Sequence, residues 1–184
     1  MDDLVIRRFV APDTDPVWRV HDRALRASVM DYDPAYNRYL RHVEREFFEP
    51  GGWFSVVETG EHGAATTTRD HADEPAVVAI GGFQPLAYVR DDTVNVPSWL
   101  PAAVDGTRRI RSVAVAPDLQ GEGVGTALLD RLAARATERG FTDAVLQTYT
   151  SMEQACRFYE RRGYTTLAER DGERWYGKRL DGVN

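Results

Sequence analysis

The pattern of apolar and polar positions is clearest in residues 108–139, where it predicts a strand, a glycine-rich turn and a long helix. The β-prone run 110–115 is typical of a strand, which Pro117 and Asp118 end. The following apolar positions have the spacing of one helical face: Val124, Leu128, Leu129, Leu132, Ala133 and Ala136. Charged side chains occupy the opposite face, and Gly140 follows where a C-cap is expected.

The rest of the chain alternates between short β-prone runs and amphipathic helical segments. Further strands are predicted at residues 4–9, 53–58, 76–88, 143–148, from Tyr164 on, and at 175–180. Helices are predicted at 16–28, 34–49 and 153–162, with long loops at 59–75 and 89–107. This order predicts a mixed α/β (α+β) domain with a central sheet of about six to seven strands flanked by about four helices. The strand–helix–strand unit in the second half should be parallel and right-handed.

Composition and charge limit the class of protein. With 184 residues and 42% hydrophobic content, the chain is expected to form one domain over residues 1–184. The net charge of −6 argues against nucleic-acid binding, and the absence of a long apolar run or a signal-peptide pattern argues against a membrane. The single cysteine, Cys156, excludes an internal disulfide and fits a cytoplasmic location. His62 and His71 lack metal-ligand spacing, so no metal site is expected.

The glycine-rich turn has the physical properties of an anion site. Gly121, Gly123 and Gly125 precede a helix whose first amides are unpaired and whose N-terminal end is positive. The pattern is neither G-x-G-x-x-G nor G-x-x-x-x-G-K-[ST], which argues against the common dinucleotide and P-loop motifs. On spacing alone, a phosphate site and a plain tight turn both remain open.

Two motifs together carry a family resemblance. SVAVAPDLQGEGVGTALL followed by LQTYTSMEQACRFYERRGY resembles the GCN5-related N-acetyltransferase (GNAT) family of acetyl-CoA-dependent acyltransferases. The first motif is Gln120-x-x-Gly123-x-Gly125, and the second is Ala155-x-x-Phe158-Tyr159-x-x-x-Gly163-Tyr164. The core of the match covers residues 108–164, and the order of elements agrees over the whole chain. The resemblance implies the GNAT acyl-CoA N-acyltransferase fold.

The resemblance also implies how acetyl-CoA would be bound. The pantetheine arm would contact the main chain of Val113, Ala114 and Val115, where the family's strand separates from its neighbour at a bulge. The pyrophosphate would lie on the loop made of Gln120, Gly121, Glu122, Gly123, Val124, Gly125 and Thr126. Tyr159 occupies the position where the family often has the general acid that protonates the leaving thiolate. Tyr159 also falls on the apolar face of its helix, so a purely structural role is open.

The implied reaction is direct attack by an amine on the thioester of acetyl-CoA in a ternary complex. Two positions depart from the family pattern: Gln147 replaces a glutamate that some relatives use as a base, and Met152 replaces an asparagine that often contacts the cofactor. Other base candidates are Asp31, Asp33, His42, Glu44 and Glu46, although most should be solvated. A base acting through water, or no base at all, is equally compatible with the sequence.

Several alternatives stay open at this level. Cys156 could carry an acyl group only with a nearby base, and a plain helix cysteine is favoured. The acceptor would be an amine on a small molecule or a peptide, next to acidic and aromatic side chains of residues 31–53. A homodimer is an open alternative, because dimers are common among similar proteins. Rival functions are a non-catalytic acyl-CoA-binding regulatory module of the same fold, favoured by Gln147 and Met152, and a nucleotide-binding α/β protein.

Overall fold

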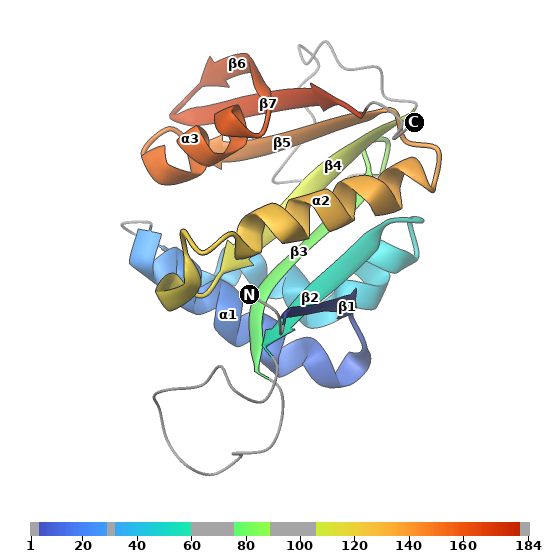
Figure 1. The fold of residues 1–184 in the computed structure, drawn as a ribbon, viewed down its shortest axis with the longest axis vertical. Helices are drawn as coiled ribbons and strands as arrows, with labels where there is room; N and C mark the ends of the chain where they lie inside the picture. The colour runs from blue at the N-terminus through green and yellow to red at the C-terminus, as the bar shows by residue number, and fades with distance from the viewer. Residues whose placement is uncertain (1–3, 29–31, 60–75, 89–105, 181–184) are drawn as a thin grey trace.

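The computed structural model describes residues 4–28, 32–59, 76–88 and 106–180, which form one seven-stranded sheet with helices on both faces (Figure 1). The strands are β1 Leu4–Arg8, β2 Trp53–Thr59, β3 Val77–Pro85, β4 Thr107–Val115, β5 Asp143–Tyr149, β6 Thr165–Arg170 and β7 Glu173–Arg179. They lie in the order β1-β2-β3-β4-β5-β7-β6, and only β4 and β5 are parallel neighbours. The predicted mixed fold and the parallel pairing across the strand–helix–strand unit are confirmed. Of the loops predicted over 59–75 and 89–107, residues 60–75 and 89–105 lie outside the described residues, whereas Thr59 ends β2 and Thr107 begins β4.

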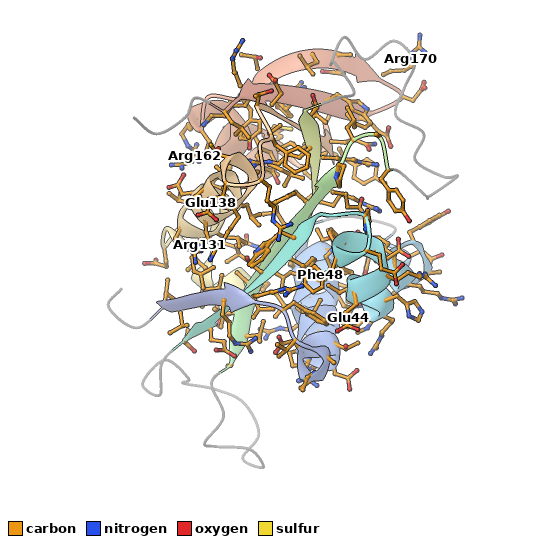
Figure 2. All side chains as sticks on the ribbon, turned by 90° about the vertical axis from the view of Figure 1, so that its right-hand side faces the viewer. Glu44, Phe48, Arg131, Glu138, Arg162 and Arg170 are labelled. Atoms are coloured by element: carbon orange, nitrogen blue, oxygen red, sulfur yellow. The ribbon has the colours of Figure 1, made fainter. Side chains whose placement is uncertain are left out.

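The helices divide between the two faces of the sheet. One face carries α2 (Val124–Thr137) and α3 (Glu153–Arg161); the other carries α1 (Thr14–Ser28), η2 (Pro34–His42) and η3 (Glu44–Phe48) (Figure 1). Figure 2 shows this division through side chains, with Arg131 and Glu138 on the α2 side and Glu44 and Phe48 on the other. Two single turns, η1 (Ala11–Asp13) and η4 (Pro117–Leu119), follow β1 and β4.

Each face of the sheet has its own hydrophobic core. The core under α2 and α3 includes Phe83, Leu128, Leu132, Leu146 and Tyr176. The core under α1, η2 and η3 includes Val17, Leu40, Phe47, Phe54 and Ile80. Because burying one such side chain contributes roughly 1.5–3 kcal/mol, these two cores account for why the periodic segments fold onto the sheet.

The segment predicted as a regular helix over 34–49 is wound differently. It forms a 3-10 helix, η2, followed by a π-helical turn, η3. In a 3-10 helix residues three apart lie one above the other, so Leu40 and Val43 both face the core, and the wider turn then brings in Phe47. Packing against the sheet, rather than intrinsic propensity, therefore decides the winding of this segment.

Close approach between β3 and its neighbours depends on a glycine. A Cβ atom on Gly82 would lie 2.6 Å from Phe54 Cδ2, 2.7 Å from the Trp53 carbonyl oxygen and 2.9 Å from Phe47 Cδ1. A side chain at this position would therefore force β2 or η3 away from the sheet. In the part of the chain that the structure describes, no helix is long and apolar enough to cross a membrane.

Candidate active site

The sheet opens between its two parallel strands. β4 and β5 pair at only three positions: Thr107↔Asp143, Arg108↔Ala144 and Arg109↔Val145. Beyond them, β4 continues against β3 and β5 continues against β7. Within the described residues, the facing edges at 110–115 and 146–149 have no strand partner, and the two ribbons diverge there (Figure 1). A ligand could therefore approach the main chain in this part of the sheet, where no neighbouring strand covers it.

A β-bulge in β4 lies at this opening. Between Arg111 and Ala114 the strand takes three steps while β3 takes two, so one residue of β4 is extra. Ser112 has a φ of 59°, a left-handed conformation that is uncommon for a residue other than glycine. The predicted cofactor strand, residues 113–115, starts directly after this bulge.

The side chains of residues 113–115 are used for packing. Val113 and Val115 lie against the core under α2, and Ala114 belongs to the core under α1. Their main chain is consequently the part that a ligand could contact.

The glycine-rich loop presents a row of amides at the beginning of α2. Gly121 and Gly123 have φ values of 90° and 83°, which only glycine adopts without strain, and Gly123 is the N-cap of the helix. Within the described residues, the amides of Gly123, Val124, Gly125 and Thr126 have no main-chain acceptor. Gly121, Glu122 and Gly123 are exposed. The loop therefore has the free, outward amides that an anion site requires.

Gln120 fastens this loop to the strand before it. Its Nε2 atom donates a hydrogen bond to the Val115 carbonyl oxygen at 3.1 Å. The side-chain amide of Gln120 thus acts within the protein, at the end of β4, and holds the loop beside the opening.

Helix α3 brings the second sequence motif against the loop. A Cβ atom on Gly125 would lie 3.4 Å from Phe158 Cζ and 3.5 Å from Val115 Cγ2, so α2, α3 and β4 meet at this glycine. The next residue, Tyr159, is 8% exposed, and its ring centroid lies 5.8 Å from that of Tyr164. Two motifs that are separate in sequence therefore form one site.

This combination of an open parallel strand pair, an amide loop and a following helix matches a known family. The model of the acetyltransferase (GNAT) family covers residues 22–164 of the chain. The chain belongs to this family. It is accordingly an acyltransferase, and the family resemblance seen in the sequence is confirmed. A search of curated protein sequences finds no match to it.

Solved structures share the GNAT fold at low sequence identity. An acetyltransferase from Streptococcus agalactiae 2603 is 16% identical with a TM-score of 0.72, over 98% of this chain and 100% of that one. The PaiA N-acetyltransferase from Thermoplasma acidophilum, in complex with coenzyme A, is 9% identical with a TM-score of 0.66, over 96% and 98%. A GNAT acetyltransferase from Brucella melitensis, in complex with acetyl-CoA, is 17% identical with a TM-score of 0.64, over 97% and 88%. At these identities the likeness shows the fold.

In this GNAT protein the candidate acid, Tyr159, is enclosed by other side chains. Burial raises the pKa of its hydroxyl far above the ordinary value for tyrosine, and the neighbouring Tyr164 and Cys156 raise it further. The phenol therefore keeps its proton throughout the neutral pH range, but the raised pKa makes it a weaker acid toward a thiolate than an ordinary tyrosine.

The candidate bases between residues 33 and 46 are either exposed or engaged by residues close to them in sequence. Asp33 is the N-cap of η2, and Glu46 forms an ion pair with the neighbouring arginine at 2.7 Å. His42 and Glu44 are exposed, and Asp31 lies outside the described residues. Within the described residues, no hydrogen bond or ion pair joins the side chains of the other four to β4 or β5.

The two positions that depart from the GNAT pattern are held by neighbours. Gln147 Oε1 accepts a hydrogen bond from Arg109 Nη2 at 3.1 Å. Met152 Sδ accepts from the Thr148 hydroxyl at 3.7 Å. An amide at position 147 accepts one hydrogen bond from the arginine but cannot take a proton from an amine at neutral pH.

Cys156 lies on the buried side of α3. It is 4% exposed, and its Sγ atom lies 3.6 Å from the Tyr149 carbonyl oxygen, to which the thiol donates. This contact accounts for the cysteine as a buried helix residue.

Two further residues were not among those predicted from the sequence. His21 is only 5% exposed on α1, its Nδ1 has no partner among the described residues, and burial lowers its pKa to about 4. Its place four residues after Val17 and three before Ala24, on the apolar stripe, was the signal for its burial. Tyr39 of η2 makes a hydrogen bond with Ser112, 73 residues away, at 2.9 Å between the two hydroxyl oxygens. No sequence signal indicates that contact.

Proposed function

We propose that this GNAT protein transfers an acetyl group from acetyl-CoA to a primary amine of a small molecule or peptide, by direct attack in a ternary complex. The observation that carries the proposal is the meeting of the β4–β5 opening, the free amides at the start of α2, and α3 with Phe158 and Tyr159. Family membership supports it, as do the coenzyme A and acetyl-CoA in the Thermoplasma and Brucella structures.

The cofactor would use main chain rather than charged side chains. The amides of 123–126 suit the pyrophosphate because the helix N-terminus supplies a positive field without a lysine or arginine, whereas the Glu122 amide already donates to the Leu119 carbonyl oxygen. The pantetheine arm would run along the unpaired edge of residues 113–115, in the place that a neighbouring strand would take. Gln120 would serve this arrangement by fixing the loop to Val115.

The chemistry needs three contributions from the protein. The amine nitrogen bonds to the thioester carbonyl carbon, and unpaired β4 amides stabilise the oxyanion that forms. When the carbon–sulfur bond breaks, the Tyr159 hydroxyl gives its proton to the thiolate sulfur, and the phenolate takes a proton back from solvent after the products leave. The attacking nitrogen loses its own proton to solvent, because Gln147 cannot accept it and is held by Arg109.

Thiol release from acetyl-CoA over a panel of amines tests the proposal. The background from the protein should be low, because its one cysteine is buried. Amine-dependent release with acetylated product is the expected result. Tight acetyl-CoA binding without release for any amine would favour the non-catalytic acyl-CoA-binding module. Thermal protection by ATP or NAD, but not by coenzyme A, would favour a nucleotide-binding protein instead.

A pair of glycine variants tests the loop assignment. Gly123 at the start of α2 and Gly140 beyond its end have φ values of 83° and 80°, so an alanine carries the same conformational cost at both places. Gly123→Ala should weaken coenzyme A binding, measured by calorimetry, by about tenfold, because the added methyl group and altered backbone disturb the amides. Gly140→Ala should leave the affinity unchanged. Equal affinities in the two variants would remove the loop from the cofactor site.

A further inference from the structure

The side chain of Tyr39, on η2, contacts both Arg111 and Ser112 of the β4 bulge. The Tyr39 hydroxyl lies 2.9 Å from Ser112 Oγ, and the Arg111 guanidinium lies 4.2 Å from the centre of the Tyr39 ring. In a regular strand, consecutive side chains point to opposite faces, so a single residue could not contact both. The bulge turns Arg111 and Ser112 to the same face, where Tyr39 meets them.

This contact matters because the bulge is not a relaxed conformation. Ser112 has a φ of 59°, which a residue with a Cβ atom keeps only where its surroundings hold it. Arg111 also donates to Gln84 Oε1 at 3.2 Å, and Gln84 Nε2 donates to the main-chain carbonyl of Glu46. Among the described residues, contacts from both η2 and η3 therefore hold the bulge.

We infer that Tyr39 is a positioning residue for the acetyl-transfer site. Its hydroxyl and ring hold Ser112 and Arg111 in the bulged conformation, and the bulge in turn directs the main chain of Val113 and Ala114 into the β4–β5 opening. The position of η2 is thereby coupled to the conformation of the cofactor strand, residues 113–115. This inference rests on the proposed function, since it assigns the bulge to the thioester-binding edge.

The test compares Tyr39→Phe with Tyr36→Phe. Both substitutions remove one hydroxyl from η2, but Tyr36 is 74% exposed, whereas Tyr39 is partly buried and bonded to Ser112. Phenylalanine keeps the ring under Arg111, so folding is preserved. Tyr39→Phe should lower kcat with the best amine by about fivefold, the loss expected for one hydrogen bond, with little change in the amine KM. Tyr36→Phe should stay at the wild-type rate.

A double-mutant cycle and a readout independent of activity complete the test. Ser112→Ala should lower kcat by the same fivefold. The double variant Tyr39→Phe/Ser112→Ala should be no slower than either single variant, because the two substitutions remove the same hydrogen bond. Deuterium uptake by the segment 110–116 should be about threefold faster in Tyr39→Phe and unchanged in Tyr36→Phe.

The outcomes separate this inference from the proposed function. Multiplicative losses in the double variant, or a Tyr39→Phe protein with wild-type kcat and wild-type uptake at 110–116, would overturn the positioning role while leaving acetyl transfer intact. If the wild-type protein neither binds acetyl-CoA nor releases thiol, the proposed function fails. The uptake comparison then still decides whether Tyr39 holds the bulge.

Discussion

His21 should make the free energy of unfolding depend on pH between 6.5 and 4. The imidazole is 5% exposed on α1, and its Nδ1 atom has no hydrogen-bond partner within the described residues. Burial lowers its pKa from 6.5 to about 4, partly offset by the charge of Asp22. The unfolded chain therefore binds a proton near pH 6.5, whereas the folded chain resists protonation until pH 4.

The direction and size of the effect follow from this difference. Above pH 6.5 both states carry neutral imidazole and stability is complete; as pH falls towards 4 the unfolded state gains protons and stability is lost. The full difference of 2.5 pH units between 6.5 and 4 corresponds to about 3 kcal/mol, of which about 2 kcal/mol is lost between pH 7.5 and pH 5.

Acidic groups act in a lower window. Burial alone would raise the pKa of Asp13, but hydrogen bonds from Arg7 and from the Val10 amide outweigh it and lower the pKa below 3.8. The stability that Asp13 contributes is therefore present above pH 3.8 and is lost as pH falls further. Asp13 therefore contributes little to a comparison between pH 7.5 and pH 5.

Urea unfolding followed by tryptophan fluorescence at pH 7.5 and pH 5 measures the effect. Between pH 7.5 and pH 5, the free energy of unfolding should fall by about 2 kcal/mol more in the wild-type protein than in His21→Leu. The leucine packs in the same apolar stripe but cannot titrate. His42→Gln, at an exposed histidine, should behave like the wild-type protein. If His21→Leu loses as much stability as the wild type on acidification, the buried neutral histidine is not the cause and the reasoning is refuted.

Three further substitutions have defined outcomes. Gly82→Ala should lower the free energy of unfolding by roughly 2–3 kcal/mol and shift the urea midpoint downwards, because the new Cβ would lie 2.6 Å from Phe54 Cδ2; an unchanged midpoint would mean that the strands separate freely. Tyr159→Phe should lower kcat by about 100-fold and leave coenzyme A affinity within twofold, and an unaltered rate would remove the general-acid role. Gln147→Glu should leave the pH–rate profile unchanged, because Arg109 would hold the new carboxylate ionised. Arg109 Nη2 lies 3.1 Å from the present amide oxygen. A new inflection near neutral pH would show that the substitution had created a base.

Local signals in the sequence were sufficient for the elements of the fold. The order of strands and helices, the parallel strand–helix–strand unit and the family itself were predicted, because periodicity, turn residues and two spaced motifs act over short distances. The place of the glycine-rich turn was also predicted, and Gly121 and Gly123 have the positive φ values that glycine allows; from spacing alone a phosphate site and a plain tight turn both stayed open.

Features that depend on contacts across the sheet were not predicted from the residues. The winding of 34–48 as 3-10 and π helix follows from how Leu40, Val43 and Phe47 pack, which an apolar pattern alone does not specify. The partners of Gln147 and Cys156 likewise come from Arg109 and Tyr149, which lie on other elements.

The sequence by itself therefore determined the elements, their order, and the strand–turn–helix unit with its glycine-rich turn, because these depend on residues within one or two turns of each other. Only the tertiary structure decided where β4 leaves β5, that Ser112 carries the bulge, and that Tyr39 holds it from 73 residues away. Register and bulge position are set by which side chains meet across strands, and those meetings exist only after the chain has folded.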